Sequence, residues 1–127
     1  MGSIKPRISV EYVDNTAVIT FTEKRILEES DIRILEESIF SVVEQAEHIN
    51  LVLDFRNVQF LSSSVLGLLI RVSKKVYEDD GQLKLCHIDS KIYEVFKITR
   101  LNKIFDIYKD LDSALGSLRS RKESQEQ

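Results

Sequence analysis

The sequence predicts an α/β domain with a mixed, mostly parallel sheet of about five strands, which includes an N-terminal β-hairpin and is flanked by about four helices. Near the N-terminus, two alternating segments are joined by a turn-forming Asp14-Asn15 pair. Short apolar runs then alternate with longer amphipathic segments, which is typical of parallel strands joined by right-handed helical crossovers. A chain of 127 residues fits a single domain over residues 1–127, with its core at about 8–118 and a flexible tail at 119–127.

The strand predictions rest on two hydrophobic patterns. Residues 8–13 alternate apolar and polar side chains, which indicates a half-buried strand, and the chain returns after Asp14-Asn15 as its partner. Residues 51–55, Leu-Val-Leu-Asp-Phe, form a nearly continuous apolar run, which favours a central strand buried on both faces. In chain order, the strands are predicted at residues 8–13, 16–22, 51–55, 83–88 and 104–108.

The helix predictions rest on apolar residues spaced three and four apart, which mark one buried face. Short polar side chains that accept backbone N–H bonds predict the starts of these helices, at Ser30 or Asp31, Ser63, Asp89 or Ser90, and Asp110. The second helix is expected to end near Gly81, and Ile70 is expected to widen its buried stripe. Other side chains expected to point inward are Ile26, Leu27 and Val95.

The composition argues against several classes of function. The 18 basic and 21 acidic residues are interleaved and no basic stripe appears, so we expect no nucleic-acid partner. No apolar stretch is long enough for a signal peptide or a membrane span, so we expect no membrane insertion and a cytoplasmic location. Cys86 is the single cysteine and no metal-type Cys/His spacing occurs, so we expect no disulfide, metal or cofactor.

The candidate site is the point where the apolar run at 51–55 leads, through a short loop, into three consecutive serines, Ser62, Ser63 and Ser64. In open α/β sheets, functional groups gather where strand ends meet helix N-termini. One serine is explained by helix capping, and three exceed what capping requires. Arg56 and Asn57 lie beside the cluster in sequence and are expected at an interface or in the loop.

An enzymatic use of Ser63 is a weaker hypothesis. A nucleophilic serine needs a base and an oxyanion hole, the chain has two histidines, His48 and His87, and no Gly-x-Ser-x-Gly elbow is present. Nucleotide-binding glycine motifs are also absent from the sequence. We therefore expect a protein that is not an enzyme.

Around the serines, the sequence resembles the STAS family, specifically bacterial anti-sigma factor antagonists, and the resemblance extends from about residue 8 to residue 118. The family pattern at its switch is Asp-Ser-Ser/Thr-Gly-Leu-Gly. Ser62 stands where the family has Asp, Ser63 falls on the phosphorylatable serine and Ser64 matches the next residue. Val65 replaces the first glycine, while Leu66-Gly67 match.

The resemblance implies the STAS fold and a regulator that binds an anti-sigma factor or serine kinase and is switched by phosphorylation of Ser63, with Ser62 and Ser64 as lesser candidates. A phosphate adds about −1.5 to −2 charge, and a helix N-terminus tolerates that charge. The implied partner-binding residues are Arg56, Asn57, Ser62, Ser63, Ser64, Val65 and Gly67.

The departures at Ser62 and Val65 keep a second interpretation open. The chain would then be a STAS interaction module that binds without phosphorylation, as part of a larger signalling or transport complex. The orientation of Val65 determines whether a partner can approach the helix start closely. Its branched side chain either stands where a partner backbone approaches or rotates into the core.

Overall fold

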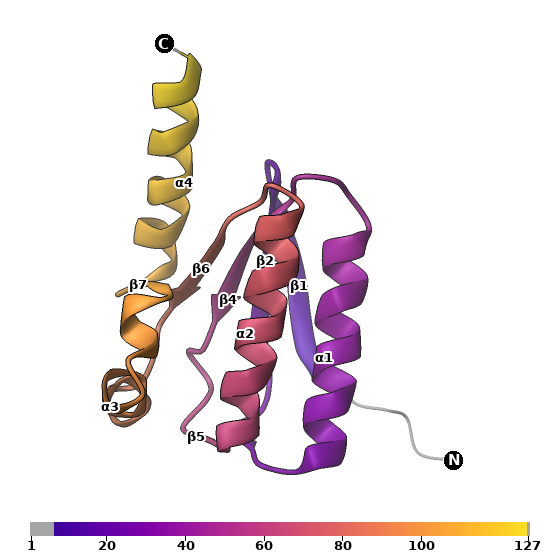
Figure 1. The fold of residues 1–127 in the computed structure, drawn as a ribbon, viewed down its shortest axis with the longest axis vertical. Coiled ribbons are helices and arrows are strands. Elements are labelled where there is room, and N and C mark those ends of the chain that lie inside the picture. The colour runs from indigo at the N-terminus through magenta and orange to yellow at the C-terminus, as the bar shows by residue number, and fades with distance from the viewer. Residues whose placement is uncertain (1–6, 127) are drawn as a thin grey trace.

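The computed structural model describes residues 7–126, with side chains through residue 119, and places a mixed sheet between two layers of helices (Figure 1). In chain order the elements are β1 (Ile8–Val13), β2 (Thr16–Phe21), β3 (Arg25–Ile26), α1 (Glu29–Glu44), β4 (Asn50–Asp54), β5 (Phe60–Leu61), α2 (Ser63–Glu78), β6 (Leu83–Cys86), α3 (Ser90–Ile98), the 3₁₀ helix η1 (Leu101–Lys103), β7 (Asp106–Tyr108) and α4 (Leu111–Glu126).

The five-stranded sheet has the order β1-β2-β4-β6-β7. β1 pairs with β2 as the predicted antiparallel hairpin, and the other pairs in this sheet are parallel. Asp14 takes a left-handed conformation, with φ 53°, in the hairpin turn, where Asp is one of the few residues other than Gly that fit. The predicted fold class, a mostly parallel sheet with an N-terminal hairpin and four α-helices, is confirmed.

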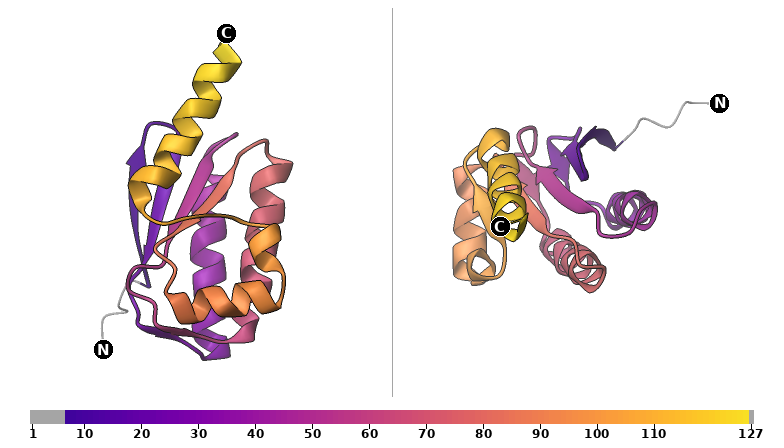
Figure 2. Two further views of the ribbon diagram at one scale, coloured as in Figure 1. Left: turned by 90° about the vertical axis from the view of Figure 1, so that its left-hand side faces the viewer. Right: turned by 90° about the horizontal axis from the view of Figure 1, so that it is seen from above.

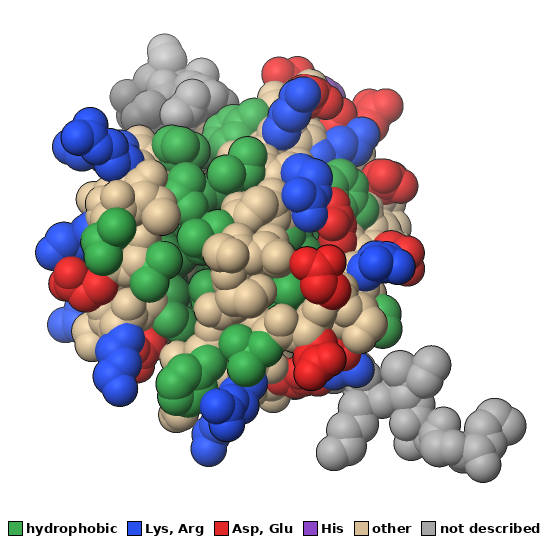
Figure 3. Space-filling view, turned by 60° about the horizontal axis from the view of Figure 1, so that its bottom comes forward, with side chains coloured by type: hydrophobic (Ala, Val, Ile, Leu, Met, Phe, Trp, Pro, Cys, Tyr) green, Lys and Arg blue, Asp and Glu red, His purple; other side chains and the backbone are tan. Residues whose placement is uncertain are grey.

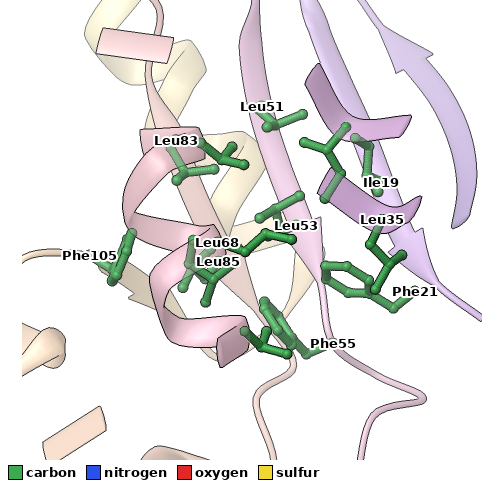
Figure 4. Packing of buried hydrophobic residues seen from close by; sticks show 14 of the residues in the cluster. Ile19, Phe21, Leu35, Leu51, Leu53, Phe55, Leu68, Leu83, Leu85 and Phe105 are labelled. Carbon is green, nitrogen blue, oxygen red and sulfur yellow. The ribbon is translucent and has the colours of Figure 1, made fainter. Parts of the chain in front are cut away.

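β4 is buried on both faces because α1 and α2 cover one side of the sheet and α4 covers the other (Figures 1 and 2). Leu51 and Leu53 pack in the larger core with Leu68 of α2 (Figure 4). Val52, which points the opposite way, packs with Ala114 and Leu118 of α4. A strand with a hydrophobic layer on each face needs a continuous apolar run, and residues 51–53 supply it.

Three residues that the sequence placed in the core lie at the surface: Leu27, Ile70 and Val95. Neighbouring side chains in extended backbone point to opposite sides, so burial of Ile26 turns Leu27 outward. Ile70 lies on the outer stripe of α2, on the far side from the buried faces of Leu68 and Leu69.

Helix boundaries also differ from the sequence predictions. Glu28 occupies the N-cap position of α1 without a side-chain cap bond, and Asp31, one of the two predicted caps, lies inside the helix with its carboxylate 2.9 Å from Arg7 Nη2. At the other end of the chain, α4 continues as helix to Glu126, through most of the segment that we expected to be a tail. Residue 127 lies outside the described residues.

Candidate functional site

The three serines occupy three different environments at the start of α2. Ser62 is the N-cap residue and its backbone N–H donates to the Ile26 carbonyl at 3.0 Å, which ties the helix start to β3. Ser64 is half-buried and its hydroxyl donates to Glu29 Oε1 at 3.2 Å. Ser63 is the exposed member of the three. Of the candidate serines, Ser63 therefore offers the accessible hydroxyl.

Ser62 has the capping position but does not make the capping bond. Its Oγ is buried without a hydrogen-bond partner, and no side-chain cap bond forms at the N-terminus of α2. The serine side chain thus contributes little of what an N-cap normally supplies.

Replacing Ser62 with alanine is therefore expected to leave the free energy of unfolding unchanged or to raise it slightly. A working cap would lose about 1 kcal/mol on the same change, whereas removal of a buried hydroxyl without a partner relieves a desolvation cost. Urea denaturation of both proteins measures the difference, and Asp89→Ala at α3 is the matched control because Asp89 Oδ1 does accept from Lys91 N–H at 2.8 Å. If Ser62→Ala lowered the free energy of unfolding as much as Asp89→Ala does, Ser62 would be a working cap and this interpretation would be wrong.

The outer stripe of α2 consists of the exposed Ser63, Ile70 and Lys74 and the half-buried Gly67, at positions spaced four, three and four residues apart. Gly67 contributes no side chain to this stripe, and a Cβ built there would lie 3.3 Å from Arg71 Nη1, a close contact that requires the Arg71 side chain to shift slightly. Val65 is 1% exposed and belongs to the core. Its branched side chain therefore takes the inward of the two orientations and does not obstruct the stripe.

A groove of about 340 Å³ between α1 and α2 borders this stripe at Gly67 and is also lined by Ser64. Across it, Arg71 binds Glu36 with two hydrogen bonds, from Nε at 2.6 Å and from Nη2 at 2.8 Å. The hydrogen bonds from Arg71 lower the pKa of Glu36, against the opposing effect of burial. This ion pair links the two helices beside the serines.

Asp54, at the carboxyl end of β4, organises a second cluster. Its carboxylate is fully buried, with Oδ1 accepting from the Arg56 backbone N–H at 2.9 Å and Oδ2 from Arg56 Nε and Nη2 at 2.9 and 2.7 Å. His87 Nδ1 lies 3.0 Å from Oδ1, on backbone with φ 55°. Burial raises the pKa of Asp54, but the hydrogen bonds and charges of Arg56 and His87 outweigh it and lower the pKa below its ordinary value.

Arg56 and Asn57, predicted beside the serines, take largely structural positions. Arg56 holds Asp54 and lines a surface hollow with His87 and Lys109, separate from the α1–α2 groove. The Asn57 side chain donates to the Phe21 carbonyl at 2.9 Å and so joins the loop to β2. Sequence reasoning missed Asp54 and His87 as a pair; the available signal was a single charged residue within the apolar run at 51–55.

One group among the described residues brings metal-ligating atoms together: those of Asp54, Cys86 and His87 lie within 4.8 Å of one another. Burial is the main cause that raises the pKa of the Cys86 thiol to about 12, so the thiol stays protonated at neutral pH. Arg56 already balances the charge of Asp54. The arrangement fits a hydrogen-bonded ion-pair cluster better than a metal centre.

Both histidines make contacts with residues other than Ser63. His87 contacts Asp54, and His48 Nδ1 lies 3.0 Å from the Asp79 carbonyl oxygen. Within residues 7–119, no hydrogen bond joins either histidine to Ser63. Neither histidine is therefore placed as a general base for Ser63.

No helix in the described part of the chain combines the length and the apolar character needed to cross a membrane.

Comparison with known proteins gives a consistent result. Residues 8–114 match the model of the STAS domain family. An anti-sigma F factor antagonist from Paenibacillus polymyxa is 32% identical over 74 residues, which are 58% of this chain and 62% of the relative's length. A solved anti-sigma-factor antagonist (STAS) domain protein from Planctomyces limnophilus has a TM-score of 0.81 at 24% identity and covers 88% of this chain and 97% of its own.

The fold is shared with a protein solved in two covalent states. The anti-sigma factor antagonist SpoIIAA in its unphosphorylated form has a TM-score of 0.74 at 18% identity, covering 89% of this chain and 96% of that one. The phosphorylated form from Bacillus has a TM-score of 0.66 at 18% identity, covering 87% and 98%. Because the family match covers residues 8–114, which are most of the chain, this protein belongs to the STAS domain family.

Proposed function

We propose that this chain is a regulator of the anti-sigma factor antagonist type, without enzymatic activity of its own, that binds an anti-sigma factor with serine kinase activity and is released by phosphorylation of Ser63. The observation that carries the proposal is the exposed hydroxyl of Ser63 at the N-terminus of α2, between one buried serine hydroxyl and one bound to Glu29. The partner contacts the stripe that begins at Ser63 and continues through Gly67.

The electrostatics of the helix start favour a switch that leaves the fold intact. The first turn of α2 contains no acidic residue, and the N–H groups of a first helical turn have no partner within the helix. A phosphate on Ser63 therefore meets favourable dipoles instead of like charge in its own helix. It faces outward next to Ser64, whose hydroxyl binds Glu29 of α1, and makes the partner-facing surface strongly negative.

SpoIIAA, a neighbour of the same fold, has been solved with and without its phosphate, which supports the expectation that a STAS fold tolerates this modification. Val65 supports the proposal as well. Its burial keeps the stripe between Ser63 and Gly67 free of a branched side chain, although the family has glycine at this position.

The test uses the full chain with each purified serine-kinase anti-sigma factor encoded in the same genome. After incubation with ATP, mass spectrometry is expected to find one phosphate, on Ser63. Ser62→Ala and Ser64→Ala serve as matched controls that keep the phosphate, and Ser63→Ala loses it. Binding of Ser63→Asp is expected to be at least tenfold weaker, or about 1.4 kcal/mol, while Ser63→Ala binds within twofold of wild type.

Two results would count against this function. If mass spectrometry finds the phosphate on another residue, or finds no phosphate, the proposed switch at Ser63 is wrong. If Ser63→Asp and Ser63→Ala both bind as wild type does, the chain is instead an interaction module that works without phosphorylation. Gly67→Ala adds a check on the surface, since Ala favours helix by about 0.5–1 kcal/mol and its Cβ asks only for a small shift of the Arg71 side-chain end, yet the change is expected to weaken binding. Ser73→Ala, outside the stripe on the same helix, is its control.

A further inference from the structure

α3 and η1 expose apolar side chains that neither element needs for its own packing. Ile98 is 80% exposed, Ile104 is 63% exposed and Val95 is 39% exposed. Val95 and Ile98 are three residues apart and share one face of α3, whereas Ile92 and Phe96 are buried on the other. An apolar group of this kind marks an interaction surface more often than a scattered single residue does.

The backbone holds this surface in place. Arg100 takes a left-handed conformation, with φ 63°, and reverses the chain between α3 and η1. Its backbone N–H donates to the Lys97 carbonyl at 3.1 Å and its carbonyl accepts from Lys103 N–H at 3.1 Å. Leu101 and Phe105 then anchor η1 in the core. Because this turn begins at residue 99, the strand predicted from residue 104 starts only at Asp106, and Ile104 faces outward.

Basic side chains surround the apolar group. Residues 89–104 carry four basic and two acidic side chains, a net +2, in a chain of net charge −3. Asp89 caps α3 and Glu94 pairs with Lys97 at 3.3 Å, which uses both acidic groups locally. The exposed cations Lys91, Arg100 and Lys103 form no ion pair within the described part of the chain.

This surface lies at the same end of the molecule as the serines. Figure 1 shows α3 and the N-terminus of α2 at the lower end of the ribbon. Viewed from there, hydrophobic side chains form a band across the face, and Lys and Arg predominate along its rim on the α3 side (Figure 3). A protein seated on Ser63 is therefore on the side of the molecule that presents α3.

We propose that Val95, Ile98 and Ile104 with the surrounding cations Lys91, Arg100 and Lys103, the α3–η1 surface, dock an acidic amphipathic segment of the partner protein. This inference rests on the proposed function, because that partner is the anti-sigma factor that contacts the α2 stripe. Apolar side chains of the segment pack on the isoleucines, and flanking carboxylates pair with the lysines and the arginine. The positive charge of this surface, set against the negative charge of the chain as a whole, is what selects an acidic occupant.

The test measures the affinity of the full chain for the purified anti-sigma factor that binds wild type. Ile98→Ser combined with Ile104→Ser is expected to weaken binding at least tenfold, and Ile34→Ser, an exposed isoleucine of α1, is expected to change it less than twofold. Lys91→Glu with Lys103→Glu is expected to weaken binding at least tenfold, against less than twofold for Arg119→Glu, an exposed cation of α4 beside Asp14 and away from the serines. Wild-type affinity is expected to fall as salt rises, because exposed charge pairs are screened.

The outcomes separate the two proposals. If no anti-sigma factor binds wild type, the proposed function fails and this inference fails with it. If wild type binds and the α3–η1 variants bind equally well, the docking surface is wrong while the function stands. Sedimentation equilibrium of the chain alone adds a third arm, since a dimer lost in the Ile98→Ser, Ile104→Ser variant would assign the surface to a second copy and overturn the acidic partner segment.

Discussion

Asp54→Ala is expected to lower the free energy of unfolding by about 3 kcal/mol. Removing one partner from a buried ion pair typically costs about 3–5 kcal/mol, and the lower end applies because the Arg56 side chain is half-exposed and can be rehydrated. His87 loses its carboxylate partner in the same step. Urea denaturation at pH 7 measures the loss, with Asp79→Ala as the control, since its pair with Lys75 at 3.6 Å is near the surface and is worth less than about 1 kcal/mol.

The pH dependence of the same site has a defined sign. The pKa of Asp54 is lower in the folded chain than its ordinary value of 3.8, so its charged form contributes stability above that value and the contribution disappears as pH falls through the folded pKa. The stability difference between wild type and Asp54→Asn is therefore expected to be constant at neutral pH and to shrink below about pH 4. A difference that is unchanged in acid would show that Asp54 acts through shape alone.

The second large effect is expected at Gly81. A Cβ built there would overlap the carbonyl oxygen of Ile49 and lie 3.1 Å from Val76 Cγ1, so Gly81→Ala must displace backbone. We expect a loss of about 3 kcal/mol, as for severe overpacking, and a fall in Tm of about 10 °C. Thermal denaturation followed by circular dichroism measures it.

Gly116→Ala on α4 is the matched control for Gly81. No atom lies within 4 Å of a Cβ built at Gly116, so the substitution meets open space within a helix. It is expected to stabilise the chain by about 0.5–1 kcal/mol. Equal and small effects at the two glycines would show that the approach of Ile49 to Gly81 is not tight in solution.

Gly81 also shows that a sequence pattern can predict a helix end while giving the glycine there the wrong role. The sequence predicts a helix end at Asp80-Gly81, and α2 ends just before it, at Glu78 with Asp79 as its C-cap. The left-handed residue, however, is Asp80 with φ 62°, and no described glycine has positive φ. Gly81 is required by a close approach between two loops that are 32 residues apart, which hydrophobic periodicity does not encode.

The side-chain pattern by itself determined a mostly parallel sheet, its antiparallel hairpin and the start of α2 at the serines, because alternation and apolar spacing depend on near neighbours in the chain. Tertiary structure alone decided that Ser63 is exposed while the Ser62 hydroxyl is buried, that Val65 turns inward, that Arg56 holds a buried carboxylate and that Ile98 faces water. Each of these depends on which distant segment occupies the space beside a side chain, and that is settled only when β3, α1 and η1 are packed.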